Sequence, residues 1–163
     1  MAEKREETDD SKNRNYVSCF ASLRIEGTAS NCIDFQEVEE HLGIKPTYVV
    51  HHGETRLPGN KLALVDVWIY DVEVEKDQPL DNHLAALKTL LDPYASYLRS
   101  IAARWMVSIY CGYITDLAQG HIVIPWHLAG MFSDYGVDLE ISIQSWGGII
   151  TEAQDDEDHR ASD

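Results

Sequence analysis

Alternation of apolar and polar residues with a period of two is the strongest structural signal in this chain, because only a half-buried β-strand requires it. The clearest examples are residues 17–25 and 137–143. Residues 105–114 alternate as well, and residues 62–74 are rich in Val, Ile, Trp and Tyr, which favour strands. Because the apolar phase shifts near residues 68–70, we expect a bulge or twist there.

Helical periodicity separates these strands. Leucines recur at helical spacing over residues 79–91, which predicts the most regular helix of the chain. Asp92, followed by Pro93, predicts an N-cap and the first turn of a second helix that ends near residue 103. Asp34 predicts the start of a short helix, and Pro125 predicts the start of another that ends near residue 134.

The order of these elements predicts an α+β domain. Two β-α-β halves flank a long helical segment, and together they predict a four-stranded, mainly antiparallel sheet with helices on one face, in a ferredoxin-like arrangement. A faint internal repeat supports the two halves, since both short helices end at a glycine, Gly43 or Gly136, between apolar residues. Residues 48–60 are predicted to form a loop, and residues 121–124 a brief strand or an extended lead-in.

Charged segments at both ends set the expected domain boundaries. Residues 1–15 hold five acidic and four basic side chains, and residues 151–163 hold six acids and one arginine, so we expect a disordered arm and a disordered tail around a single domain of residues 16–150. The net charge is −15 overall and −9 within residues 16–150. Acidity of this size argues against nucleic acid and anionic membranes as partners, and favours a cationic protein.

Three scattered cysteines indicate neither a disulfide framework nor a zinc site. Cys19, Cys32 and Cys111 show no CxxC spacing, and we expect all three to be free thiols in the core. The sequence shows no apolar run long enough to cross a bilayer and no apolar signal-peptide segment, so we expect a cytosolic protein. No motif predicts a cofactor.

An ordered set of short motifs resembles the bacterial "domain of unknown function 4279" family. The motifs are Phe20–Gly27, Leu42–Pro46, Gly53-Glu54, Trp68, the Leu80-x-x-His83-Leu84 helix start and Leu139–Ile143. The resemblance extends over about residues 17–144. It implies a small bacterial cytosolic protein, and it implies no catalytic residues.

The sequence His51-His52-Gly53-Glu54 is the strongest candidate for a metal or catalytic site. Imidazole and carboxylate groups are suitable metal ligands, but adjacent residues of an extended chain point in opposite directions, unlike the paired histidines of HExxH on a helix. A metal at His51, His52 and Glu54 would need a further ligand from elsewhere in the chain. The alternative is a surface turn with a structural role.

No other group predicts catalysis. Cys19 and Cys111 fall at inward strand positions, where a thiol is unreactive, and no GxSxG turn or glycine-rich phosphate loop is present. His83 begins the leucine-rich helix, where an imidazole caps the helix or packs beside the sheet more often than it binds a ligand. The chain is therefore more consistent with a protein that is not an enzyme.

Large aromatic residues predict a possible interaction surface. By the expected strand phase, Phe20, Trp68, Tyr70 and Tyr110 face away from the core side of the first strand. Either a helix covers these rings or the phase is different, or they form an exposed band that binds a partner or a second copy of the chain. Nearby acids disfavour stacking of nucleic-acid bases on the rings.

These observations give one leading hypothesis and one alternative. The leading hypothesis is a non-enzymatic protein-interaction module, for example an inhibitor or immunity protein that covers a basic effector. The alternative is a small-ligand or metal-binding protein, or an enzyme, that uses His51, His52 and Glu54. Homodimerisation through the aromatic band is compatible with both.

Overall fold

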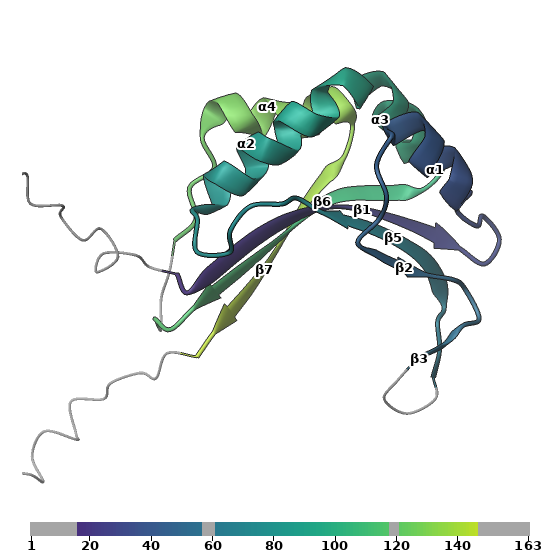
Figure 1. Cartoon of the computed structure of the whole chain (residues 1–163), viewed down its shortest axis with the longest axis horizontal. Helices are drawn as coiled ribbons and strands as arrows, with labels where there is room; N and C mark the ends of the chain where they lie inside the picture. The colour runs from purple at the N-terminus through teal and green to yellow at the C-terminus, as the bar shows by residue number, and fades with distance from the viewer. Residues whose placement is uncertain (1–15, 57–60, 118–120, 147–163) are drawn as a thin grey trace, which may run out of the picture.

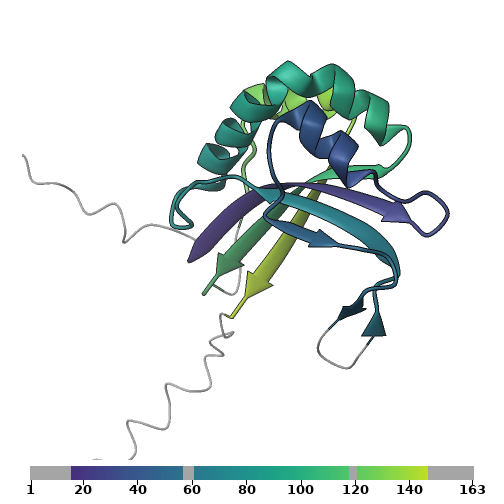
Figure 2. The same cartoon turned by 45° about the vertical axis from the view of Figure 1, so that its right-hand side comes forward.

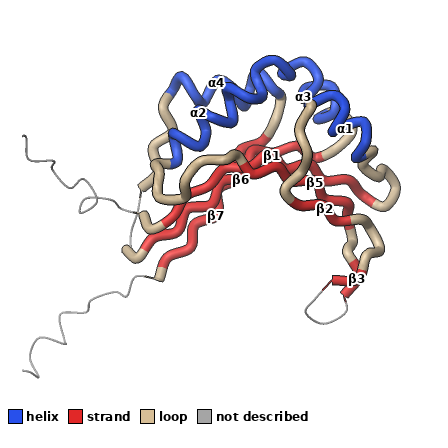
Figure 3. Tube along the Cα trace, in the orientation of Figure 1, coloured by secondary structure: helices blue, strands red, loops and turns tan. Residues whose placement is uncertain are grey.

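The computed structural model describes residues 16–56, 61–117 and 121–146, which form a layer of helices over a β-sheet (Figures 1 and 3). The sheet strands are β1 (Ser18–Thr28), β2 (Tyr48–Val50), β5 (Val65–Asp71), β6 (Met106–Thr115) and β7 (Asp138–Ser145). The helices are α1 (Phe35–Leu42), α2 (Leu80–Leu91), α3 (Ala95–Ala102) and α4 (Trp126–Tyr135), with the 3-10 turn η2 (Asp92–Tyr94) between α2 and α3. The α+β class is therefore confirmed.

The sheet is five-stranded and mixed, which corrects the expected four-stranded sheet. Its strand order is β2-β5-β1-β6-β7, with β6 and β7 parallel and the other neighbours antiparallel. The two expected halves are not equivalent, because β1 pairs with β5 in antiparallel fashion whereas β6 and β7 form a parallel β-α-β unit. The ferredoxin-like duplication is thus not confirmed.

The fifth strand, β2, lies in a segment that was expected to be a loop. Tyr48, Val49 and Val50 extend along the edge of β5, as their β-branched and aromatic side chains favour. The turn that follows contains Gly53 at φ 80° and leads into a small hairpin of β3 (Thr55–Arg56) and β4 (Lys61–Leu62). Residues 121–125 contain no strand and form the extended lead-in to α4.

The helix-facing side of the sheet forms the main core. Cys19, Ala21, Leu23 and Ile25 of β1 are fully buried, which confirms the predicted alternation of this strand. The leucines of α2 at positions 80, 84, 87 and 91 pack into the same cluster. The main core therefore lies between the helices and this side of the sheet.

Helix ends follow the sequence signals at three places and depart from them at one. The Asp34 carboxylate accepts the N–H of Glu37 at 3.0 Å, and Gly43 and Gly136 end α1 and α4 at positive φ, as predicted. The predicted N-cap at Asp92 is wrong. Asp92 is in the right-handed helical region, so η2 joins α2 to α3 without a break.

All the described helices lie on one side of the sheet, and the other side has no described helix over it (Figures 1 and 2). The sheet curves so that this uncovered side is concave (Figure 1). We call it the open face. None of the helices in the described ranges is both long and apolar enough to cross a bilayer.

Candidate functional site

The open face consists of strand residues whose side chains point away from the helices. Residues paired in register on neighbouring strands share a face, so the register of the sheet identifies all of them. They are Tyr48 and Val50 of β2; Val65, Val67, Ile69 and Asp71 of β5; Ser18, Phe20, Ser22, Arg24, Glu26 and Thr28 of β1; Met106, Ser108, Tyr110, Gly112 and Ile114 of β6; and Asp138, Glu140, Ser142 and Gln144 of β7.

Aromatic rings occupy the centre of the open face. The Phe20 ring lies directly over Gly112, where an added Cβ would come within 1.9 Å of a ring carbon. The Phe20 and Tyr110 ring centroids are 6.0 Å apart, and the Arg24 guanidinium carbon lies 5.5 Å from the Tyr110 centroid. Glycine at position 112 therefore makes room for a ladder of two rings and a cation across β1 and β6.

A small apolar cluster occupies the β2–β5 side of the open face. Val50 and Val67 are buried together with Ala63, which follows β4, and the partly buried Val65 and Ile69 pack against them. Its outer neighbour Tyr48 is 50% exposed. The hairpin of β3 and β4 thus contributes to this edge of the face.

Charge on the open face is predominantly negative. Its strands present four acids, Glu26, Asp71, Asp138 and Glu140, and one base, Arg24. Arg24 pairs with Glu26, and its Nη1 lies 3.9 Å from an oxygen of Glu140. Since one cation cannot balance four carboxylates, the face carries a net negative charge.

The four aromatic residues predicted to share a face are divided between the two sides of the sheet. Phe20 and Tyr110 lie on the open face, as predicted. Trp68 is paired with Ile25 and fully buried on the helix-facing side, and Tyr70 is paired with Leu23 on that same side. The predicted phase of the second long strand was therefore wrong.

The orientation of Asp66 explains why the predicted phase of β5 was wrong. An acid at position 66 favours an outward orientation for residues 66, 68 and 70, but the side chain of Asp66 is only 4% exposed and points to the helix side. Its two carboxylate oxygens accept the backbone N–H groups of Ile33 (2.9 Å) and His52 (2.7 Å). Burial raises the pKa of Asp66, but these hydrogen bonds outweigh burial and hold it below its usual value.

The His51–Glu54 segment forms a structural turn. Oε2 of Glu54 accepts the N–H of His51 at 3.1 Å, and the N–H of Glu54 donates to the His51 carbonyl at 3.0 Å. The His51 ring packs edge-on against Phe35, with centroids 4.7 Å apart, while the N–H of His52 binds Asp66. Across residues 16–56, 61–117 and 121–146, no three His, Cys, Asp or Glu side chains gather closely enough to hold a metal ion.

Burial keeps the thiols of Cys19 and Cys111 and the imidazole of His83 away from solvent. Burial raises the pKa of Cys19 to about 11 and that of Cys111 to about 12, so both thiols stay protonated, as their inward positions predicted. Cys32 is exposed, which corrects its predicted place in the core. His83 is fully buried in α2, and burial lowers its pKa, which favours the neutral imidazole.

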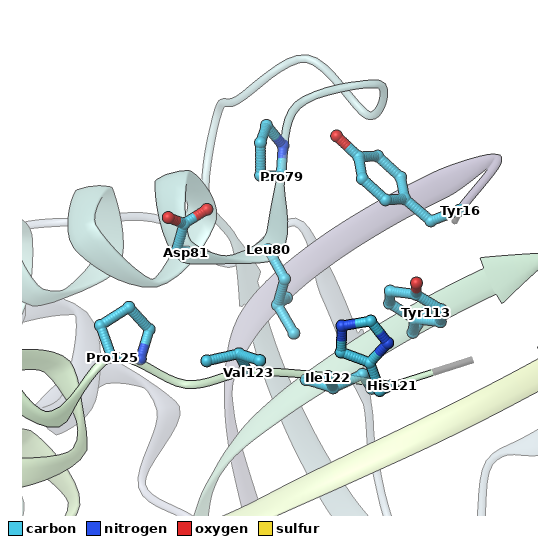
Figure 4. A pocket seen from close by; sticks show the side chains of 9 residues that line it. All are labelled: Tyr16, Pro79, Leu80, Asp81, Tyr113, His121, Ile122, Val123 and Pro125. Carbon is cyan, nitrogen blue, oxygen red and sulfur yellow. The ribbon is translucent and has the colours of Figure 1, made fainter. Parts of the chain in front are cut away.

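An open cavity of about 270 Å³ lies where the start of α2 meets β6 and the lead-in to α4. The rings of Tyr16, Tyr113 and His121 gather on one side of it, and Asp81 and Pro125 lie towards the other (Figure 4). Sequence reasoning did not find this cavity, because its walls come from four separate parts of the chain: Tyr16, residues 79–81, Tyr113 and residues 121–125. Its volume is close to the lower end of ordinary ligand pockets, about 300 Å³.

Comparison with known proteins gives one match. The family model described as "Domain of unknown function (DUF4279)" matches residues 17–146, which cover all the strands and helices described above. No curated protein and no solved structure shows detectable similarity to the chain. The resemblance seen in the sequence motifs is thereby confirmed, and the chain belongs to the DUF4279 family of domains of unknown function.

Proposed function

We propose that this chain is a cytosolic protein-interaction module whose open face binds a basic protein, in the way that an inhibitor or immunity protein covers a basic effector. The observation that carries the proposal is the open face itself. No described helix lies over it, and it combines partly exposed aromatic side chains with four acids and one base.

Exposed apolar side chains on the open face are of the kind that protein interfaces use. Tyr48, on the edge strand β2, is 50% exposed, and Met106, the first residue of β6, is 59% exposed. Interfaces are enriched in aromatic residues, Met and Arg. Because the helix-facing core is closed without them, these side chains remain accessible to a partner.

The acids define the chemistry of that partner. Complementary charge speeds the encounter of two proteins and rejects partners of like charge, so the four carboxylates favour a basic surface. They oppose phosphate polymers and anionic lipid, whose binding depends on Lys and Arg that displace counterions. The turn at His51, His52 and Glu54 is not proposed as a site, because its backbone and carboxylate groups already hydrogen-bond one another.

A charge-swap experiment tests the proposal. The variant Asp71→Asn/Asp138→Lys makes the open face more positive by three charges, and the amide introduced at position 71 can still accept the hydroxyl of Ser22, which is 2.6 Å from Asp71. The immobilised full chain is offered lysate of the source organism, and bound proteins are eluted with salt. We expect the native chain to retain a basic protein that leaves by about 0.5 M salt, where the Debye length is about 4 Å, and the variant to lose it.

A matched control makes the same change of charge on the helix side. Glu40→Gln/Asp134→Lys alters two exposed residues of α1 and α4 and is expected to retain the partner. Equal retention by the native chain and the open-face variant would contradict the proposal. So would equal loss in the open-face variant and the control, since that result would indicate net charge alone.

A further inference from the structure

The outer edge of β7 is a long strand edge that lacks the usual protection. β7 is the last strand in the sheet order and pairs, within the described ranges, with β6 alone (Figures 1 and 3). Proteins commonly protect such edges with proline, lysine or a bulge. The eight residues of β7, DLEISIQS, contain no proline, lysine or arginine.

The apolar side chains of β7 are also incompletely covered. Ile141 is 37% exposed and Ile143 is 59% exposed, although their register partners Cys111 and Tyr113 are buried on the helix-facing side. The helix layer therefore covers β6 but leaves the neighbouring isoleucines open along the sheet margin. An added strand beside β7 would cover them.

We propose that this strand is β7 of a second copy of the chain, paired in antiparallel fashion about a two-fold axis through Ile141. The two five-stranded sheets then form one continuous sheet, with the helices of both copies on the same side. The pairing leaves both open faces uncovered, so it goes beyond the proposed function and does not depend on it.

The charge pattern of β7 is compatible with self-pairing in this register, and it excludes registers in which the acids face each other. Its two acids lie in the first half of the strand, and the second half is neutral. With the axis at Ile141, Asp138 lies opposite Gln144 of the second copy and Glu140 lies opposite Ser142. With the axis at Glu140, two carboxylates would face each other directly, which destabilises strand pairing.

Apolar contacts in this register are self-complementary as well. Ile141 lies opposite itself, and Leu139 lies opposite Ile143 of the second copy, so the exposed isoleucines of each chain cover those of the other. A two-fold interface of this kind uses the same surface twice, which is the commonest form of homo-oligomer.

Cysteine crosslinking tests both the partner and the register. Opposite residues of an antiparallel pair have Cα atoms about 4.5 to 5.5 Å apart, within the range that a disulfide spans. In the full chain with Cys32→Ser and Cys111→Ala, which remove the exposed thiol and the thiol of the register partner of Ile141, Ile141→Cys is expected to give a covalent dimer on mild oxidation. The control carries Met106→Cys in the same background, at a site on the open face that is more exposed than Ile141 (59% against 37%), and is expected to stay uncrosslinked.

The molecular mass in solution tests the dimer independently and requires no introduced cysteine. Light scattering of the native chain is expected to show twice the chain mass, and Ile143→Lys is expected to halve it, while Met106→Lys leaves it doubled. Unchanged circular dichroism in both variants checks that they are folded.

A monomeric native chain, or crosslinking at position 106 equal to that at position 141, would overturn the dimer. Crosslinking of Ser142→Cys in place of Ile141→Cys would overturn the register.

Discussion

At the scale of single residues, Asp66 connects three segments that are distant in the sequence. Its carboxylate joins β5 to the chain before α1 through Ile33, and to the turn after β2 through His52. The N–H group of Ile33 is buried and needs a partner, and that of His52 is partly buried. The acid therefore helps to position the His51–Glu54 turn through the N–H group of His52.

Replacement of Asp66 tests this role. In Asp66→Asn, one side-chain position becomes a donor that faces a backbone N–H, so we expect a loss of about 1 to 3 kcal/mol in the free energy of unfolding at neutral pH. Urea unfolding of the native chain and the variant measures the difference.

The pH dependence of that difference gives a second check. Because the pKa of Asp66 is lowered in the fold, its contribution is present above the usual carboxyl pKa and is lost as the pH falls through the native value. The difference between native chain and variant should therefore shrink as the pH falls from neutral to about 3. A difference independent of pH would show that the carboxylate charge contributes nothing.

Asp66 also lies in the strand whose orientation was predicted wrongly from the sequence. The alternation of β1 was predictable because every residue on its buried face is apolar. In β5, Val65, Val67 and Ile69 lie on the open face and the acid lies inside, so the pattern favoured the opposite phase. Hydrogen bonds to distant backbone groups decide that orientation, and no local pattern contains them. The one sequence feature that could have indicated this orientation was a single acid among the apolar residues of the strand.

At the scale of elements, the helix layer is joined by polar contacts at the end of α2. Asp92 pairs with Lys88 at 2.7 Å, and the hydroxyl of Tyr135 donates to Asp92 at 2.6 Å, which connects α4 to α2. Burial, together with this hydrogen bond to a carboxylate, raises the pKa of Tyr135, so it remains a donor throughout the physiological range.

Tyr135→Phe isolates this contact. Asp92 is half-exposed and keeps Lys88, so we expect the variant to lose about 1 kcal/mol, which corresponds to a fall of about 2 to 4 °C in Tm. Differential scanning calorimetry measures the fall.

Tyr97→Phe is the matched control. The Tyr97 hydroxyl is buried and makes no hydrogen bond of normal length and angle to a described residue, so its removal is expected to leave Tm unchanged or slightly higher. If the two variants shifted Tm equally, the link from α4 to α2 would not contribute to stability.

Element positions were largely predictable, but their pairing was not. Caps at Asp34, Gly43 and Gly136 are local signals, and the leucine spacing of α2 is local too. Asp92 before Pro93 has the same local signature as an N-cap, yet its carboxylate makes distant contacts and the helix continues. The pairing of β1 with both β5 and β6 depends on contacts between distant parts of the chain. Local patterns do not contain those contacts, so the two β-α-β halves looked equivalent in the sequence.

At the scale of the whole molecule, the main core and the uncovered surfaces of the sheet use different side chains. The helix layer and the helix-facing side of the sheet form the main core, whereas the open face and the β7 edge carry exposed side chains such as those of Tyr48, Met106 and Ile143. The α+β class and one-sided helix layer were predicted from the sequence. The composition of the open face follows from strand order, so only the structure reveals that four acids share it with the rings of Phe20, Tyr48 and Tyr110.

Side-chain footprinting of the complex with the captured basic partner tests the central claim most directly. Hydroxyl-radical oxidation reports the exposure of Tyr48 and Met106 on the open face, and of Trp126, which is 87% exposed in the helix layer, as an internal reference. If the open face is the interaction surface, oxidation of Tyr48 and Met106 falls several-fold on binding while that of Trp126 is unchanged. Protection of Trp126 with Tyr48 and Met106 unaffected would contradict the account.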